Sequence, residues 1–584
     1  MSRCNLVPVA LFILNTGRSL SQGMYMESEG KWSENYFKTV VAVEMNPNDI
    51  KRLGVKDRVK IARNGSSLVA LVKPSDRVPE GAIFIPMGPV ANFIIDGDTD
   101  GVGIPSFKAI EVEAGPAEEP VATLRDILKS LGAKNLDVDA LMKDISVQSG
   151  EKRVVESVSC PFCGDLCDYL KIEVDGSKIV RNVGGCAVSI AKFLNYHKHR
   201  VLEPYVRRGG SLTKVDLDTA IEEAAKILAN ARYALIYGLS NTCVEAIELA
   251  VELAEILRGV VDNTSTVCHG PTMLAIQEVG TVAMTFAPVL HLADVVVFWG
   301  SNAREAHANH VSRLVMAMGR FRKGRKDRKL VVVDSRKTML ADMADIFIQV
   351  EPGKDLELAT ALRMALRDLE IESPSVAGVP REKIYELAEL MKTARYGALF
   401  FGMGVTHTGA KLRNIQAVIK LVQELNEWTK WVLLPMRGHY NVTGANQVSL
   451  WLTGYPYAVD FSRGFPRMIP GVTTAVDLLA NGDVDAALII ASDPAAHFPR
   501  KAVEHLSKIP VIVIDAKWSL TAAFADVIIP AGLVGIECEG TAYRMDSVPI
   551  YMKKVVNPPP GVLCDVELLK RLTEKVKSMK GWGE

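Results

Sequence analysis

Apolar residues beyond about position 230 come in short continuous runs. Each run is followed by a loop of small or polar residues and then by a segment with helical spacing. These runs occupy residues 234–237, 294–299, 330–333, 398–401, 486–491 and 511–514. Continuous apolar strands that alternate with helices indicate parallel sheets covered on both faces. The pattern therefore predicts an α/β protein with doubly wound parallel sheets.

The first 114 residues have a different pattern. Short apolar runs, at 40–43, 58–62, 69–72 and 82–86, are broken by glycine, proline and asparagine, with little helical period. This predicts a small β-barrel or sandwich. The run at 6–14 resembles a short signal sequence, but no small cleavage-site residues follow it, so we expect a first strand.

Residues 115–154 are expected to link two functional parts. Segment 115–120 is rich in glycine, proline and glutamate, and helix-spaced apolar residues follow at 121–131 and 138–145. We therefore divide the chain into a β domain at 1–114, a linker with short helices at 115–154 and a catalytic region at 155–584. Residues 155–205 form a cysteine-containing segment of that region.

Composition excludes several classes of protein. The formal net charge of zero gives no reason to expect a nucleic-acid or anionic-membrane partner. No run reaches the ~18 apolar residues that a membrane span requires, so we expect a cytoplasmic protein without a membrane span. Nine cysteines are too few for a disulfide scaffold in 584 residues.

Four of the nine cysteines lie close together. Cys160, Cys163, Cys167 and Cys186 are separated by two, three and 18 residues. Four thiolates suit either zinc or a 4Fe-4S cluster. The first two gaps differ from the paired C-x-x-C of zinc ribbons, so we favour the 4Fe-4S cluster and keep zinc, or unliganded thiols, as alternatives.

Cys268 is a candidate active-site thiol. It precedes His269, Gly270 and Pro271, and a helix is expected to begin near Thr272. A thiol beside a histidine and near a helix N-terminus should ionise readily, and thiolate suits a soft, high-valent metal. An isolated cysteine is otherwise most often a small buried hydrophobe.

The order of these features resembles the formate dehydrogenase class of molybdopterin oxidoreductases, and 436–445 resembles the arginine segment of that class. More narrowly, 267–271 and 539–546 are similar to the B-type subunit of formylmethanofuran dehydrogenase, over roughly 155–584. Residues 13–18, 81–89 and 103–108 are similar to the D-type subunit of the same enzyme, over 11–114, while 1–9 lie outside the resemblance.

The resemblance implies molybdopterin oxidoreductase domains preceded by a double-psi β-barrel that binds the dinucleotide. It also implies a redox subunit that reduces CO2 to formate, reversibly. The metal, tungsten or molybdenum, would be held by two molybdopterin guanine dinucleotides, a protein thiolate and a sulfido ligand, with electrons from the 4Fe-4S cluster. Formate would pass to a separate zinc amidohydrolase-like, A-type subunit for condensation with methanofuran. Further implied partners are the C-type subunit, ferredoxin-like or polyferredoxin-like electron-donor subunits and heterodisulfide reductase.

Three residues match the catalytic positions of the family. Cys268 matches the thiolate ligand, while His269 and Arg437 match the residues that line the CO2 or formate pocket. The planar donor fork of Arg437 suits a carboxylate. His269 is expected to supply or receive a proton near neutral pH.

The loops that follow the predicted strands supply candidate contacts to the guanosine and pyrophosphate groups. These residues are Gly300, Ser301, Asn302, Asp334, Arg336, Gly402, Gly404, Ser492 and Asp515. Candidate pterin contacts from the N-terminal domain are Asn15, Gly17, Arg18, Pro86, Gly88 and Asn92. His307 and His310 are expected to edge the cofactor loop rather than to bind zinc.

The chain departs from the wider class at one position. That class often has a lysine two residues after the fourth cluster cysteine, whereas Cys186 is followed by Ala187 and Val188, and the nearest lysine is Lys192. The electron-path residue therefore stays unassigned. The alternative functions are a stand-alone formate dehydrogenase and a non-catalytic electron-transfer scaffold, although scaffolds lack the residues found here at 268, 269 and 437.

Overall fold

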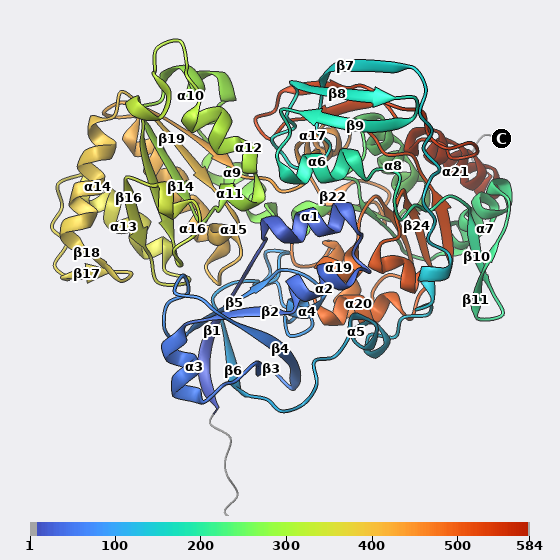
Figure 1. The fold of residues 1–584 in the computed structure, drawn as a ribbon, viewed down its shortest axis with the longest axis horizontal. Helices are drawn as coiled ribbons and strands as arrows, with labels where there is room; N and C mark the ends of the chain where they lie inside the picture. The colour runs from blue at the N-terminus through green and yellow to red at the C-terminus, as the bar shows by residue number, and fades with distance from the viewer. Residues whose placement is uncertain (1–8, 582–584) are drawn as a thin grey trace, which may run out of the picture.

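The computed structural model describes residues 9–581, and its N-terminal part is a closed six-stranded barrel (Figure 1). The strand order is β1-β5-β2-β4-β3-β6. The strands are β1 (Ala10–Gly17), β2 (Ala42–Met45), β3 (Arg58–Arg63), β4 (Ser66–Pro74), β5 (Ala82–Pro86) and β6 (Ile110–Pro116). The predicted small barrel is confirmed. The part of the expected first strand that precedes Val9 lies outside the described residues.

The barrel carries short helices that the hydrophobic pattern did not predict. They are α1 (Leu20–Ser28), α2 (Glu34–Val40), α3 (Pro47–Leu53) and α4 (Pro89–Asn92). The first three begin at Ser19, Ser33 and Asn46, whose side chains accept a hydrogen bond from a backbone N–H of the first turn. Capping and tertiary packing stabilise these helices, and none has a continuous apolar stripe. The sequence therefore shows no helical spacing of apolar residues in these segments.

The linker contains one helix instead of the two expected. α5 (Leu124–Ser130) begins with a capping box between Thr123 and Asp126. Residues 138–145 form only the short 3₁₀ turn η1 (Val138–Ala140). The chain beyond that turn pairs with 197–200 instead, because Ile145 donates to the carbonyl of His197 and Arg200 donates to that of Lys143.

A nine-stranded sheet forms the larger part of the catalytic region, in the order β11-β10-β25-β24-β23-β12-β13-β21-β22. Its central strands β25, β24, β23, β12 and β13 are parallel. The strands are β10 (Tyr205–Arg208), β11 (Ser211–Lys214), β12 (Ala234–Gly238), β13 (Val260–Asn263), β21 (Val459–Asp460), β22 (Arg467–Met468), β23 (Ala486–Ile490), β24 (Val511–Asp515) and β25 (Val527–Pro530).

Alternate residues of these strands enter two different cores. Leu235 and Ile489 pack with α18 (Ala475–Asn481) and α20 (Arg500–Leu506). Ile236 and Leu488 pack on the other face. The helices of that face are α7 (Leu217–Asn230), α8 (Val244–Leu257) and α21 (Asp565–Lys580).

A separate five-stranded sheet has the order β16-β15-β14-β19-β20, and all its strands are parallel. The strands are β14 (Val295–Trp299), β15 (Lys329–Asp334), β16 (Ile346–Gln349), β19 (Tyr396–Phe401) and β20 (Lys430–Pro435). One face packs on α13 (Asp355–Leu366), α14 (Arg381–Thr393) and α16 (Lys411–Leu425), and the other on α10 (Phe286–Leu292). The predicted doubly wound parallel sheets are therefore confirmed.

The cysteine segment forms a small layer of its own. Its antiparallel strands are β7 (Lys152–Val158), β8 (Leu170–Asp175) and β9 (Lys178–Val183), followed by α6 (Ala187–Leu194). α1 of the N-terminal domain packs against α6. In Figure 1 the five-stranded sheet lies on the left, the nine-stranded sheet on the right and the barrel below. Within residues 9–581, no helix has the length and apolar character needed to cross a membrane.

Candidate functional site

Two cavities lie where the parallel strands of the two sheets end. The first cavity is bounded by loops that follow β12, β23, β24 and β25, and by α1 and α6. The second cavity is bounded by loops that follow β14, β15, β19 and β20, and by the barrel. Ligands of open α/β sheets bind at the carboxyl ends of strands. Arg18, Ala306 and Gly438 line both cavities, so the two adjoin.

The first cavity has a strongly charged wall. Lys31 of the N-terminal domain forms a 2.7 Å ion pair with Asp493, which follows β23. Lys192 pairs with Glu27 at 3.1 Å, and Lys517 donates to the Glu27 carbonyl. Burial lowers the pKa of Lys517 to about 8, although Glu27 opposes the shift. The wall therefore carries charges of both signs, and its lysines are held by carboxylates.

The second cavity is built around glycines that touch one another. A Cβ on Gly300 would lie 2.7 Å from the Gly404 Cα, and one on Gly402 would lie 2.6 Å from the Gly300 carbonyl oxygen. Gly300 also has φ = +56°, a conformation that favours glycine. Burial lowers the pKa of Lys108, which lines this cavity, to about 8. The loop backbones therefore approach each other closely and leave room for a ligand.

Several buried polar atoms of both cavities have no hydrogen-bond partner within the described chain. Both side-chain atoms of Asn302 are unpaired, as are the hydroxyls of Ser492 and Ser519, Nδ1 of His439 and Nδ1 of His307. Buried polar groups are normally paired in a native protein. The chain therefore fits polar, phosphate-bearing ligands in both places.

Cys268 lies between β13 and α9 (Gly270–Val279), at the end of the 3₁₀ turn η2 (Thr264–Val267). The Thr406 hydroxyl donates to its carbonyl at 3.0 Å. Burial raises the pKa of the Cys268 thiol, while the Gly438 backbone N–H, Arg18 and Arg437 oppose the rise. Desolvation in the chain alone therefore opposes the ready ionisation that was expected of this thiol.

Arg437 follows β20 and brings a cation from the five-stranded sheet toward Cys268. Its Nη1 donates to the Thr443 hydroxyl at 3.0 Å, Nη2 lies 3.1 Å from the Met273 sulfur, and Nε has no partner within the described chain. Burial lowers the pKa of Arg437 to about 10. The guanidinium therefore stays charged at neutral pH and keeps one donor free.

His269 is held on both sides of its ring. Nε2 lies 3.1 Å from the Met436 carbonyl oxygen, and Nδ1 lies 3.0 Å from the Thr272 hydroxyl. Because a carbonyl only accepts, Nε2 carries the hydrogen. Burial, reinforced by Arg437, lowers the pKa of His269 to about 3. The expectation that it exchanges a proton near neutral pH is therefore wrong in this geometry.

The four neighbouring cysteines form one electrostatic group. Cys160 donates its backbone N–H to the carbonyl of Cys167, and Cys186 is the N-cap of α6. Burial raises the pKa of each thiol, and neighbouring thiols add to the rise for Cys160 and Cys163. Among the residues that the structure describes, no group of three or more His, Cys, Asp or Glu side chains is placed to hold a metal ion. This finding bears on the zinc and the 4Fe-4S alternatives alike.

Most sequence-predicted cofactor residues line the cavities. Arg18, Ser492 and Asp515 line the first, and Asn15, Gly17, Arg18, Gly300, Ser301, Asn302, Asp334, Arg336, Gly402 and Gly404 line the second. His307 also lines the second, as expected for a residue that edges the cofactor loop.

Three predicted pterin contacts lie elsewhere. Pro86 pairs with Gly17 in the barrel, a Cβ on Gly88 would meet Val40, and Asn92 donates to the Ala496 carbonyl. They stabilise the domain rather than line a cavity, because β5 continues into the packed helix α4. Sequence reasoning also missed the cavity cations Lys31, Lys108 and Lys517. Of these three, only Lys108 could have been noticed in the sequence, because it is the last residue of the 103–108 stretch that is similar to the D-type subunit.

Comparison with known proteins now identifies the class. Residues 200–575 match the model of the molybdopterin oxidoreductase family, and residues 12–111 match that of the molydopterin dinucleotide binding domain. The chain belongs to the molybdopterin oxidoreductase family and is an oxidoreductase with a pterin-bound tungsten or molybdenum cofactor.

Its relatives are more specific. The chain is 52% identical to the B-type subunit of the tungsten-containing formylmethanofuran dehydrogenase 2 of Methanocaldococcus jannaschii, over 73% of this chain and 99% of the relative. The chain is also 40% identical to the protein FwdD of the same organism over 124 residues, which are 20% of this chain and 92% of that protein.

A solved structure shares the fold. One chain of the formyltransferase/hydrolase complex (FhcABCD) from Methylorubrum extorquens, in complex with methylofuran, superposes with a TM-score of 0.53 at 24% identity. The match covers 64% of this chain and 99% of that chain.

Proposed function

We propose that this chain is the redox subunit of a formylmethanofuran dehydrogenase, in which a barrel of the D type is fused ahead of a catalytic region of the B type. It reduces CO2 to formate, reversibly. The observation that carries the proposal is the meeting of Cys268, from the end of the nine-stranded sheet, with Arg437, from the end of the five-stranded sheet. Neither residue lines a cavity itself, but both lie beside Gly438, which lines both cavities: Arg437 precedes it in the chain, and its backbone N–H is bonded to Cys268. The relatives of both parts support the assignment.

Each cavity would hold one molybdopterin guanine dinucleotide. The cations and unpaired side chains of the first cavity and the glycine loops of the second would bind their phosphate and polar groups. The Cys268 sulfur would be the protein ligand of tungsten or molybdenum, beside a sulfido ligand. When bound, the metal supplies two-electron redox chemistry.

The residues of this chain position the substrate. Arg437 is charged at neutral pH and offers the unpaired Nε to a carboxylate oxygen, so it binds formate and stabilises negative charge on reducing CO2. Thr443 and Met273 fix its orientation. His269 stays neutral, and its bond to the Met436 carbonyl ties the Cys268 loop to the Arg437 loop. We therefore assign His269 to positioning rather than to proton transfer.

The four cysteines would hold a 4Fe-4S cluster that exchanges electrons with the first cavity. Pro161 and Phe162, which lie between the first two cysteines, line that cavity, as does Lys192. The N-terminal helix α1 packs on α6 and closes this region. Electrons would come from ferredoxin-like or polyferredoxin-like subunits docked at the cysteine segment.

Formate would then leave for a separate zinc amidohydrolase-like protein of the complex, as in the relatives' enzyme class. The C-type subunit and heterodisulfide reductase complete the proposed partners. A stand-alone formate dehydrogenase is the alternative. Co-purification of a zinc amidohydrolase-like protein supports the complex, and its consistent absence from an active preparation supports the stand-alone enzyme.

The first test is formate-dependent viologen reduction by the anaerobically purified native complex, beside a Cys268→Ala variant. We expect the variant to lose activity by at least on the order of a thousandfold, as when an essential active-site group is removed. Cys243→Ser is the matched control, because this buried free cysteine is the N-cap of α8 and packs on Gly540, whereas Cys268 is bonded to the backbone of Gly438. Full activity of Cys268→Ala would contradict the proposal, as would no activity in a wild-type preparation that contains metal and iron.

A further inference from the structure

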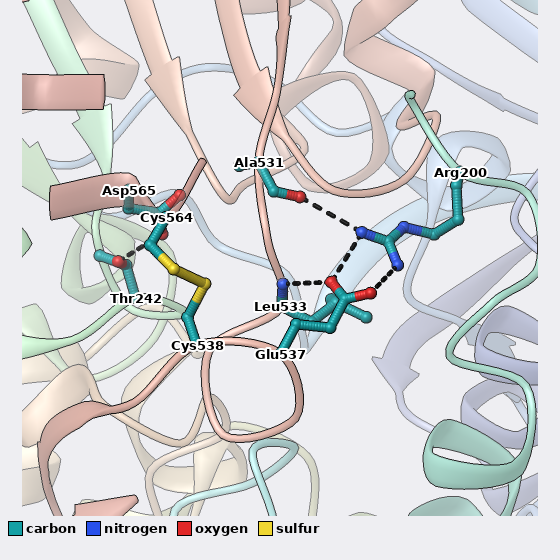
Figure 2. The surroundings of a disulfide bond; sticks show 8 residues. All are labelled: Arg200, Thr242, Ala531, Leu533, Glu537, Cys538, Cys564 and Asp565. Carbon is teal, nitrogen blue, oxygen red and sulfur yellow. Dashed lines mark hydrogen bonds and ion pairs between the residues drawn. A yellow bond between two sulfur atoms is a disulfide. The ribbon is translucent and has the colours of Figure 1, made fainter. Parts of the chain in front are cut away.

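A disulfide between Cys538 and Cys564 lies beside the first cavity (Figure 2). It joins the loop after β25 to the N-cap of α21, across a sequence separation of 26 residues. Cys538 is only 1% exposed, whereas Cys564 is partly exposed. Of the two residues, Cys564 is the more exposed, so we take its sulfur as the one that an incoming reagent attacks.

Both segments joined by the disulfide form part of the cavity wall. Residues 531–534 line the first cavity on one side of the bond, and Asp565 lines it on the other. The backbone N–H of Gly532 donates to the Leu563 carbonyl at 2.9 Å. The Thr242 hydroxyl donates to Asp565 at 2.5 Å. The bond thus lies where two separate parts of the wall meet.

The same loop also touches the cysteine segment. A Cβ on Gly535 would lie 3.2 Å from Pro161, which follows Cys160 directly. Glu537 forms two bonds with Arg200, at 2.6 and 2.8 Å, and both side chains are fully buried. Figure 2 shows the disulfide and this ion pair on opposite sides of the loop. The disulfide and the Arg200–Glu537 ion pair therefore both hold this part of the wall, and of these two only the disulfide responds to a reductant.

We propose that the Cys538–Cys564 disulfide is a redox-responsive cross-link. A dithiol reductant opens it and so makes the wall of the first cavity more mobile. This rests on the proposed function in one respect, that the cavity holds a dinucleotide whose retention the wall controls. The oxidised protein holds its cofactor tightly. The dithiol form admits or releases it.

The exchange is balanced as follows. A thiolate of the reductant attacks the Cys564 sulfur, and the Cys538 sulfur leaves as a thiolate and takes a proton. The second thiol of the reductant then displaces Cys564 from the mixed disulfide. The protein gains two electrons and two protons, and the reductant becomes a disulfide. The ion pair with Arg200 survives, so the loop opens at one side and does not unfold.

Hydrogen–deuterium exchange of residues 531–538 in the purified complex tests whether the disulfide restricts the motion of the wall. After treatment with dithiothreitol, we expect their amide exchange to accelerate on the order of tenfold, because a cross-link restricts the chain that it closes. Alkylation and mass spectrometry of the untreated complex should show the cross-linked 538–564 peptide. Cys538→Ser should exchange fast with or without dithiothreitol, while Cys243→Ser should behave like the wild type.

Pterin retention is the second readout. Pterin that passes a filter is quantified by its fluorescence after oxidation, and the reduced complex should release it on the order of tenfold faster. No cross-linked peptide in the untreated complex, or equal exchange of 531–538 in both redox states, would overturn the inference. Faster exchange without faster release would also overturn it. A complex without pterin would overturn the proposed function, while the exchange of 531–538 still decides whether the disulfide fastens the wall.

Discussion

The two cavities lie at equivalent places in their sheets, yet they are built by different means. The second cavity depends on close backbone contact between glycines after β14 and β19. The first depends on buried ion pairs and a disulfide that join distant segments. Backbone contact leaves no room for adjustment, whereas ion pairs and a disulfide respond to pH, partners and redox state. The first cavity, which faces the cysteine segment, is therefore the adjustable one.

The largest expected effect comes from breaking the buried ion pair between Arg200 and Glu537, which holds the loop beside the first cavity. Arg200→Met leaves the Glu537 carboxylate buried without its partner, which should destabilise the chain by about 3–5 kcal/mol. Urea unfolding of the purified chain measures the loss. The double variant Arg200→Met/Glu537→Leu should recover most of it, because no unpaired charge remains.

The second cavity supplies the comparison. Its pair between Arg336 and Glu44 is longer, at 3.5 Å, and partly exposed. Loss of this ion pair in Arg336→Met should therefore lower the free energy of unfolding by about 1 kcal/mol or less. Equal losses from Arg200→Met and Arg336→Met would contradict the distinction between the cavities.

The second expected effect concerns the glycine contacts. Gly402→Ala places a Cβ 2.6 Å from the Gly300 carbonyl oxygen and 2.8 Å from the Ser301 Cβ. Overpacking of this kind should cost about 1–3 kcal/mol and lower cofactor content. Thermal unfolding and pterin content measure both effects. Gly409→Ala is the control, because nothing lies within 4 Å of the added Cβ, and a similar loss there would refute the packing argument.

A further expected effect is a pH dependence that both cavities share. Burial raises the pKa of Asp565 in the first cavity, and of Asp355 in the second, to about 7. An unfolded aspartate has a pKa of about 3.9. Between about pH 4 and 7 the folded chain therefore retains protons that the unfolded chain has lost. The contribution of these groups to stability is full at low pH and falls as pH rises through that window.

Substitution by asparagine isolates this contribution. Asp565→Asn or Asp355→Asn should flatten the decline of unfolding free energy between pH 4 and 7 relative to the wild type. Urea unfolding at several pH values measures the slope. An unchanged slope in both variants would show that these carboxyls titrate normally.

Sequence patterns predicted the sheets well because a buried parallel strand needs an unbroken apolar run. All six runs became strands, from β12 to β24, each followed by a loop that lines a cavity. The short helices α1 to α3 were missed because capping and packing, not period, define them. Residues 138–145 were wrongly expected to be a helix. They pair instead with 197–200, and a local sequence pattern does not show pairing with a distant segment.

The candidate site was predicted unevenly for the same reason. Spacing singled out the four cysteines as candidates, and the residues predicted from the loops after strands line the cavities. The cavity cations Lys31 and Lys517 come from the N-terminal domain and from the loop after β24, which meet only in the folded chain. Pro86, Gly88 and Asn92, which were predicted to contact the pterin, line neither cavity, because sequence does not show which way a short turn packs.

By itself, the sequence determined the α/β architecture, the N-terminal barrel and the spacing of the four cysteines. These follow from local patterns and residue types. The tertiary structure alone decided that His269 stays neutral, that the Cys268 thiol is hard to ionise and that Cys538 meets Cys564. Desolvation and long-range contact depend on which distant segments pack together, and no local pattern encodes that.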